Sequence, residues 1–283
     1  MPVRKLAIFA LALAISSTAS ASPWIKSYTQ AQKKAKETNR FIFVDLFADW
    51  CGWCHKFEQD VIPSEAFQKV TDNMVLLRLN TEDQAEGTNI SRRYNVTSLP
   101  TFLVLDADGM VVGIIRGYQV PNDFATSIKD VQGRYNDFMK KVSTENSFGK
   151  DFQKRLELAK EFRARYALPQ AETRFKKIIG ERNLPVNVRD ETYYELALTQ
   201  MMAKKYDDSL GTIQKFAAVQ NKGEPYEKSR LLIGDVYLQE GKFDKAVAEY
   251  RSFKASFPQS QFVKNVDMLL PQLERQIATT KKQ

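Results

Sequence analysis

The sequence predicts an α/β domain with a mixed central sheet, followed by an all-α domain of helical repeats. Short apolar runs alternate with amphipathic stretches up to about residue 140, and from residue 152 onward the pattern is helical almost throughout. The length supports two units, because about 260 residues without a leader exceed the ~100–150 residues of a usual domain. We therefore place the α/β domain at residues 22–140 and the helical domain at residues 141–283.

The first 21 residues predict a cleaved secretory signal peptide. Arg4 and Lys5 precede the apolar run LAIFALALAI, and the small residues SSTASA lead to a cleavage position after Ala21. An apolar core of about ten residues is too short for a membrane anchor, which needs about 20. We therefore expect an exported, periplasmic protein that has no membrane span after cleavage.

Charge gives little support for a nucleic-acid partner. The formal net charge is +8, and loss of Arg4 and Lys5 with the leader lowers it to +6. The remaining basic residues are spread among acidic ones and form no tract. We therefore expect no nucleic-acid binding.

The order of the segments in the first half predicts the α/β architecture. We expect a helix at 24–39, a strand at 41–47, a helix at 52–61, a strand at 74–80, a helix at 84–94, two strands joined by a turn at 106–109, and a helix from 121. FIFVDLF and MVLLRLN are short apolar runs typical of buried strands, and the DADG turn joins two further apolar runs. Strand, helix, strand, helix, hairpin and helix predict a mixed sheet.

Both cysteines of the chain lie in the stretch DWCGWCHKF, between the first strand and the next helix. A bridge between residues so close in sequence constrains little of the unfolded chain, so the pair is expected to react rather than to stabilise. Cys51 lies at a helix N-terminus, where the helix dipole and free N–H groups favour a thiolate. We expect Cys51 to be the attacking sulfur and Cys54, one turn further along, to resolve a mixed disulfide.

Asp45 lies six residues before Cys51 in an otherwise apolar strand. A carboxyl group in that setting is expected to be desolvated, with a raised pKa, and to accept or deliver the proton of Cys54. The alternative is that Asp45 points to solvent at a strand end. Trp50 and Trp53 flank the first cysteine, and we expect Trp50 to pack over the sheet edge and Trp53 to contact a polypeptide substrate.

Several spaced motifs within residues 24–137 resemble the thioredoxin superfamily. They are FVDLFADWCGWC, the step LPT before FLVLDADG, and Gly117 after the last strand. The resemblance implies a thioredoxin fold with a nucleophilic Cys51, a resolving Cys54 and a proton-carrying Asp45. It also implies that Pro100 is cis and lies against the cysteines.

In that family the backbone of the residue before the cis-proline, here Leu99, pairs with the bound substrate strand. The sequence differs from thioredoxin itself at Trp53, in the HK after the second cysteine, and in the longer segment FEQDVIPSEAFQKVTDN. These features resemble an exported branch that includes the C-terminal domain of transmembrane disulfide reductases. They leave the direction of electron flow open, because the residues between the cysteines tune the potential.

The pattern Cys-x-x-Cys-His is also an attachment signal for c-type haem. Here it follows a buried strand instead of lying in a helical core, the contexts of Asp45 and Pro100 are both present, and Trp53 would crowd the ring. His55 is expected either to stabilise a thiolate or to lie on the helix surface. Two cysteines and one histidine do not complete a tetrahedral zinc site, so we expect neither a cofactor nor a metal.

The second half contains an internal repeat. Turn signals occur at 167–169, 205–207 and 241–243, and LLIGDVYLQEGKFDKAVAEYRSF aligns with YELALTQMMAKKYDDSLGTIQKF. The alignment places Gly234 over Ala197, with Ala159 at the same position of an earlier repeat. Small residues at these positions would let paired helices approach closely.

The last repeat resembles a tetratricopeptide unit, with Arg230 in place of the usual tryptophan. The residues that carry this resemblance are Ile233, Gly234, Tyr237, Gly241, Phe243, Ala246, Tyr250 and Pro258. Three repeats and a terminal helix at 261–280 would suffice for a small solenoid. Such arrays usually present a concave surface to a peptide or protein. The alternative is a packing or dimerisation domain without a groove.

These patterns predict an exported thiol-disulfide oxidoreductase of the protein-disulfide reductase or isomerase type. We expect it to act on protein disulfide or dithiol clients, to exchange electrons with a redox partner protein, and to bind a client or partner through its repeats. The alternative is a scaffold or chaperone-like binder in which the redox pair is regulatory or vestigial.

Overall fold

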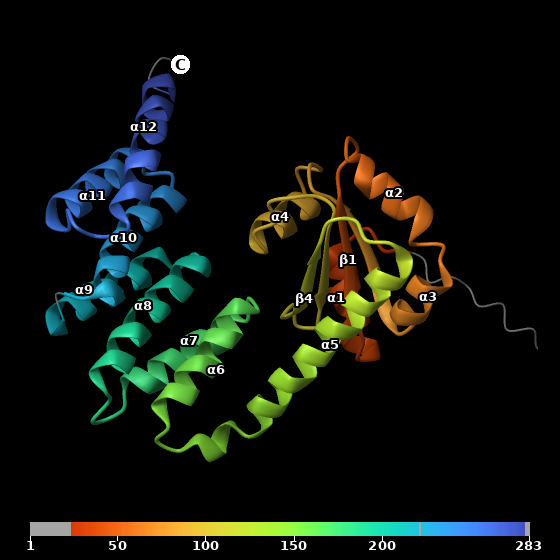
Figure 1. Cartoon of the computed structure of the whole chain (residues 1–283), viewed down its shortest axis with the longest axis horizontal. Helices are drawn as coiled ribbons and strands as arrows, with labels where there is room; N and C mark the ends of the chain where they lie inside the picture. Colours follow the sequence, from red (N-terminus) through yellow and green to blue (C-terminus); the bar gives the residue numbers. More distant parts are fainter. Residues whose placement is uncertain (1–23, 221, 281–283) are drawn as a thin grey trace, which may run out of the picture.

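The computed structural model of the chain describes residues 24–220 and 222–280. A mixed four-stranded sheet flanked by helices comes first, and a run of helices follows, as the sequence predicts (Figure 1). The predicted signal peptide, residues 1–21, lies outside the described residues. Within the described ranges, every helix is too short or too polar to cross a bilayer.

The sheet has the order β2-β1-β3-β4. Its strands are β1 (Phe41–Phe47), β2 (Met74–Asn80), β3 (Thr101–Leu105) and β4 (Val111–Arg116). β1 runs parallel to β2 and antiparallel to β3, and β3 is antiparallel to β4. The predicted mixed sheet is therefore confirmed, and β1 lies in its interior.

Two apolar cores cover the two faces of the sheet. On one face lie α2 (Gly52–Asp60), α3 (Glu65–Thr71) and α5 (Pro121–Ser143), and on the other lie α1 (Tyr28–Thr38) and α4 (Glu86–Arg93). Because side chains alternate along a strand, Phe43 of β1 faces α2 and α5, whereas Ile42 and Val44 face α1 and α4. α3 was not predicted as a helix. It begins where the Ser64 hydroxyl accepts a hydrogen bond from the Phe67 N–H.

The first helix begins at Tyr28, and the prediction that it begins at Trp24 is wrong. The Ser27 side chain caps the helix, and the residues before it are extended along the open edge of β2. The Ile25 N–H donates to the Leu76 carbonyl at 2.8 Å, and the Ile25 carbonyl accepts from the Arg78 N–H at 3.0 Å. Pairing with an edge strand has therefore overridden the local helical pattern.

All the secondary structure elements in the described part of the second region are helices. This region contains η1 (Glu145–Phe148), α6 (Phe152–Ala164), α7 (Leu168–Ile179), α8 (Val186–Met202), α9 (Tyr206–Val219), α10 (Glu224–Gln239), α11 (Phe243–Ser256) and α12 (Val263–Thr280). α7, α9 and α11 each begin at a predicted turn. A Cβ atom on Gly234 would lie 2.4 Å from the Tyr250 ring, so a small residue is required where α10 meets α11. The tetratricopeptide assignment itself stays a prediction.

The two regions share one apolar core. α5 continues to Ser143, past the predicted boundary at residue 140, and the Phe138 ring lies 5.0 Å from the Phe162 ring of α6. The Arg165 guanidinium donates to the carbonyls of Val111 and Val112 at 3.0 and 3.1 Å, and the Val111 N–H donates to the Arg165 carbonyl at 2.8 Å. The turn between α6 and α7 therefore covers the start of the edge strand β4.

Candidate active site

The two cysteines lie at the N-terminus of α2, directly after β1. They form a disulfide, and their side chains are 4% and 1% exposed. Cys51 is the N-cap residue, and its Sγ accepts a hydrogen bond from the Cys54 N–H at 3.2 Å. When the pair is reduced, that N–H and the dipole of α2 would favour a thiolate on Cys51.

Asp45 is buried beneath α2, on the same face of β1 as Phe43. Its side chain is 2% exposed, so the alternative of a solvent-exposed carboxyl group is wrong. Burial raises the pKa of Asp45 to about 7, against the opposing effect of the Arg78 charge. Its Oδ1 has no hydrogen-bond partner among the described residues. Both protonation states of this carboxyl group are therefore accessible near neutral pH.

Arg78 and Glu58 belong to the site, and neither was identified from the sequence. Arg78 stands opposite Asp45 in the parallel pairing of β1 and β2, and its Nε lies 3.1 Å from Asp45 Oδ2. Its two terminal nitrogens donate to the Glu58 carboxylate, with Nη2 2.8 Å from Oε2. The sequence contained one signal for Arg78. Asp45 is the fifth residue of its apolar strand and Arg78 is the fifth residue of the next one, so in-register parallel pairing brings these two side chains together.

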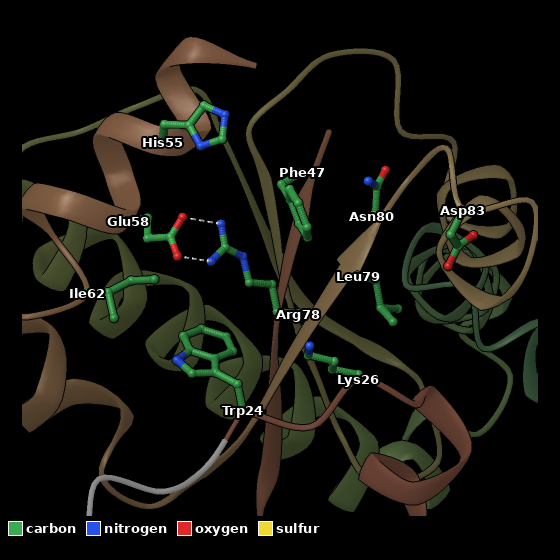
Figure 2. Close-up of a pocket in the computed structure, with 10 residues that line it drawn as sticks. All are labelled: Trp24, Lys26, Phe47, His55, Glu58, Ile62, Arg78, Leu79, Asn80 and Asp83. Carbon is green, nitrogen blue, oxygen red and sulfur yellow. Dashed lines mark hydrogen bonds and ion pairs between the residues drawn. The ribbon is translucent and has the colours of Figure 1, made fainter. Parts of the chain in front are cut away.

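A cavity of about 570 Å³ opens beside α2 (Figure 2). Its walls are formed by Trp24, Lys26, Phe47, His55, Glu58, Ile62, Arg78, Leu79, Asn80 and Asp83. Figure 2 shows the Glu58 carboxylate and the Arg78 guanidinium joined directly by two hydrogen bonds in the wall of this cavity. Arg78 thus borders the cavity on one side and the buried Asp45 on the other.

The Leu99–Pro100 peptide bond is cis, as the resemblance implies. Leu99 is half-buried and packs against the cluster that contains Cys51 and Cys54. Pro100 is buried, and its carbonyl accepts a hydrogen bond from the Gly117 N–H at 2.9 Å. The fold therefore brings this distant loop to the disulfide.

The two tryptophans flank the disulfide at the surface. Trp53 is 59% exposed, and its ring lies 5.3 Å from that of Tyr118. The expectation that Trp50 packs over the sheet edge is wrong, because its side chain is 69% exposed and its Nε1–H donates to Glu82 Oε1. Tyr118, which the sequence analysis missed, extends the aromatic surface beside Trp53.

His55 lies on the exposed side of α2 and does not contact the sulfur atoms through any hydrogen bond in the described residues. Its Nε2 lies 2.9 Å from the carbonyl oxygen of Asp49. Of the two roles expected from the sequence, thiolate stabilisation and a place on the helix surface, the structure therefore agrees with the second.

A disulfide at a helix N-terminus, a buried acid beneath that helix and a cis-proline loop together define a candidate redox site of the thioredoxin type. Residues 28–132 match the family model described as a thioredoxin-like domain. The chain therefore carries a thioredoxin-like domain, as its motifs imply, followed by an all-helical region.

Curated relatives of this part of the chain are thiol:disulfide interchange proteins DsbD. The protein from Haemophilus ducreyi is 31% identical over 104 residues, which is 35% of this chain and 18% of the relative. The protein from Cronobacter sakazakii is 34% identical over 101 residues, which is 35% of this chain and 17% of the relative. The chain thus spans less than a fifth of the length of these relatives.

Among solved structures, the oxidised C-terminal domain of DsbD from Neisseria meningitidis is 15% identical, with a TM-score of 0.35. That likeness covers 38% of this chain and 98% of the solved one.

Proposed function

We propose that the protein is an exported thiol-disulfide oxidoreductase that exchanges its Cys51/Cys54 pair with disulfides or dithiols of protein substrates. The observation that carries this proposal is the cysteine pair at the N-terminus of α2 with the Asp45 carboxyl group buried beneath the same helix, its Oδ1 without a hydrogen-bond partner among the described residues. Burying a carboxyl group without full hydrogen bonding costs folding free energy. Proton transfer to and from Cys54 would explain why Asp45 is buried, whereas a scaffold role would not. The DsbD relatives are thiol:disulfide interchange proteins, which supports this chemistry.

In the reductive direction, the Cys51 thiolate attacks one sulfur of a substrate disulfide. The substrate S–S bond breaks, a mixed disulfide forms with Cys51, and the other substrate sulfur leaves as a thiolate. Ionised Asp45 accepts the Cys54 thiol proton, and the Cys54 thiolate then attacks Cys51 Sγ. The mixed disulfide breaks, the second substrate thiolate leaves and is protonated, and the pair has given two electrons to the substrate.

A dithiol redox partner protein would return those two electrons by the same steps in reverse. With a dithiol substrate, the disulfide form would act as the oxidant. Asp45 suits either direction, because an acid with a pKa of about 7 both accepts and donates a proton near neutral pH.

We assign substrate binding to Trp53, Leu99 and Pro100. An extended polypeptide would lie along the backbone of Leu99 and place apolar side chains on the exposed Trp53 ring. The helical repeats would recruit a client or the redox partner. Their shared core with the thioredoxin-like domain would hold such a protein in a fixed orientation to the disulfide.

Reduction of insulin by the dithiol form of the full chain, with dithiothreitol as electron source, tests the proposal. We expect catalysed precipitation of the insulin B chain above the dithiothreitol background. Cys51→Ser should abolish that catalysis, whereas Asp137→Asn, on the exposed surface of α5, should leave it unchanged. Undiminished activity of Cys51→Ser would exclude the proposed role.

A further inference from the structure

The outer edge of β4 is open beyond the point where the helical region covers it. β4 is the last strand of the sheet and lies on the side of the helical region (Figure 1). The Arg165 carbonyl accepts from the Val111 N–H, and the Arg165 guanidinium donates to the carbonyls of Val111 and Val112. Within the described part of the chain, no strand pairs with this edge further along. The helical region thus satisfies the first backbone groups of the edge and leaves those that follow.

The hydrogen-bond pattern shows which backbone groups lie on the open edge. In an antiparallel pair, opposite residues alternate between exchanging hydrogen bonds and pointing away from each other. The Gly117 N–H donates to the Pro100 carbonyl at 2.9 Å, so Ile115, two residues earlier, also bonds to β3. The N–H and carbonyl groups of Ile114 and Arg116 therefore point away from β3, along the open edge.

A cavity of about 310 Å³ lies beside this edge. A Cβ atom on Gly113 would lie 2.3 Å from the Cβ of Val131, so the absence of a side chain lets α5 approach the strand closely. Arg134 follows Val131 by one helical turn and lies on the same side of α5. It therefore lines the cavity together with Ile114 and Arg165.

The cavity carries an excess of positive charge. Arg134 is exposed and makes no hydrogen bond or ion pair with any described residue. The guanidinium of Arg165 donates to backbone carbonyls. The acid in the cavity wall is Glu161, and it is already paired with Lys141 at 2.6 Å. A carboxylate from another chain would therefore find an unpaired guanidinium beside the open edge.

We propose that the edge of β4 at Ile114 and Arg116 binds an extended, acidic segment of a partner protein. The segment would add a fifth strand to the sheet through hydrogen bonds to these two residues. Its side chains opposite Gly113 and Ile115 would lie on the α5 face, where one of them would place a carboxylate on Arg134. This surface does not include the cysteine pair, so its test is independent of the proposed function.

A second copy of the chain fits this edge less well. Pairing of two β4 edges would bring the exposed Arg116 and Arg134 of one copy close to those of the other, and like charges across a strand pair are destabilising. An acidic segment would meet the same charges favourably. Charge complementarity therefore favours an acidic partner over self-association.

Hydrogen exchange of the free full chain tests whether the edge is open. The N–H groups of Ile114 and Arg116 should exchange quickly, whereas those of Gly113 and Ile115, which bond to β3, should be protected. Slow exchange of Ile114 and Arg116 in the dilute monomer would overturn the proposal, because the edge would already be covered. Protection of these two groups that grows with protein concentration would overturn it in favour of a second copy.

Binding is tested by NMR titration of the full chain with the peptide acetyl-Thr-Val-Glu-Val-Thr-amide. We expect chemical-shift changes at the Ile114 and Arg116 amides, and weaker binding of the same peptide with lysine for glutamate or with a fully N-methylated backbone. Arg134→Gln should weaken binding of the glutamate peptide about two- to fivefold. Lys129→Gln makes the same change of charge on the exposed surface of α5, away from the cavity, and should leave the affinity unchanged.

The absence of shifts at these two amides with millimolar peptide would overturn the proposal. Equal binding of the glutamate, lysine and N-methylated peptides would do so as well, because neither the charge nor the backbone pairing would then matter. An unchanged affinity in Arg134→Gln, or an equal loss in Lys129→Gln, would overturn the assignment of the carboxylate to Arg134.

Discussion

At the scale of single residues, Asp45 makes folding stability depend on pH. The folded protein holds its proton up to a pKa of about 7, whereas the ordinary value is 3.8. Between these values the folded state binds more protons than the unfolded state, so the stability contributed by the neutral carboxyl group falls as pH rises through that window. It is fully present below about pH 4 and lost above about pH 7.

Asp45→Asn should remove this dependence. At pH 8 the variant should be more stable than the wild type by up to about 4 kcal/mol, since one pKa unit corresponds to about 1.4 kcal/mol, and near pH 4 the two should be alike. Guanidinium unfolding of the disulfide forms measures the difference. Asp137→Asn, an exposed change, is the control. A stability advantage of Asp45→Asn that is equal at both pH values would contradict the assignment.

The residues of the site differ in how far sequence could identify them. Cys51, Cys54 and Asp45 were predictable, because a lone cysteine pair and an acid inside an apolar strand are unusual on their own. Arg78 and Glu58 were not predictable, because only the register of β1 with β2 and the packing of α2 on the sheet bring them close to Asp45. Trp50 was placed wrongly, because its hydrogen bond to Glu82 depends on a loop that sequence does not position.

At the scale of elements, the sequence was most informative where an apolar run was short and bounded. β1 and β2 have the predicted ends, and the helical hairpins turn where their turn signals lie. The start of α1 was missed because extended pairing of Ile25 with β2 outweighs the local pattern. α3 was missed because it is only seven residues long and its apolar side chains are aligned by contacts with α5 and β2.

The contact between α10 and α11 requires a residue without a side chain at Gly234. Gly234→Ala should destabilise the chain by about 1–3 kcal/mol, because the new methyl group meets the buried Tyr250 ring. Gly211→Ala in α9 is the matched control: that Cβ would meet nothing within 4 Å, and alanine in a helix gains about 0.5–1 kcal/mol over glycine. Thermal unfolding monitored by circular dichroism compares them. Equal stabilisation by both changes would refute the close approach.

At the scale of the whole molecule, the helical region and the thioredoxin-like domain are joined by a continuous core instead of a flexible linker. Arg165 is central to this junction, because its guanidinium binds two carbonyls of β4 and lies 4.5 Å from the Phe138 ring. The junction covers part of an edge strand that would otherwise be open to pairing with another chain. This junction fixes the helical region relative to the thioredoxin-like domain.

Arg165→Met should weaken this junction. It keeps the aliphatic packing but leaves the carbonyls of Val111 and Val112 without their donors, which should cost about 1–3 kcal/mol. Hydrogen exchange should increase in β4 and at the end of α5. Arg92→Ala on the exposed face of α4 should change neither the stability of the chain nor the exchange of these segments. Unchanged exchange in β4 of Arg165→Met would show that the two regions are held together elsewhere.

In the proposed mechanism, Cys51 attacks the substrate and Cys54 resolves the mixed disulfide. The most direct measurement is mass spectrometry of the adducts that Cys54→Ser and Cys51→Ser form with oxidised insulin under non-reducing conditions. We expect a stable insulin adduct through Cys51 in Cys54→Ser, and little or none in Cys51→Ser, because Cys54 is 1% exposed against 4% for Cys51 and lies one turn inside α2. Equal adducts in the two variants, or an adduct only in Cys51→Ser, would contradict it.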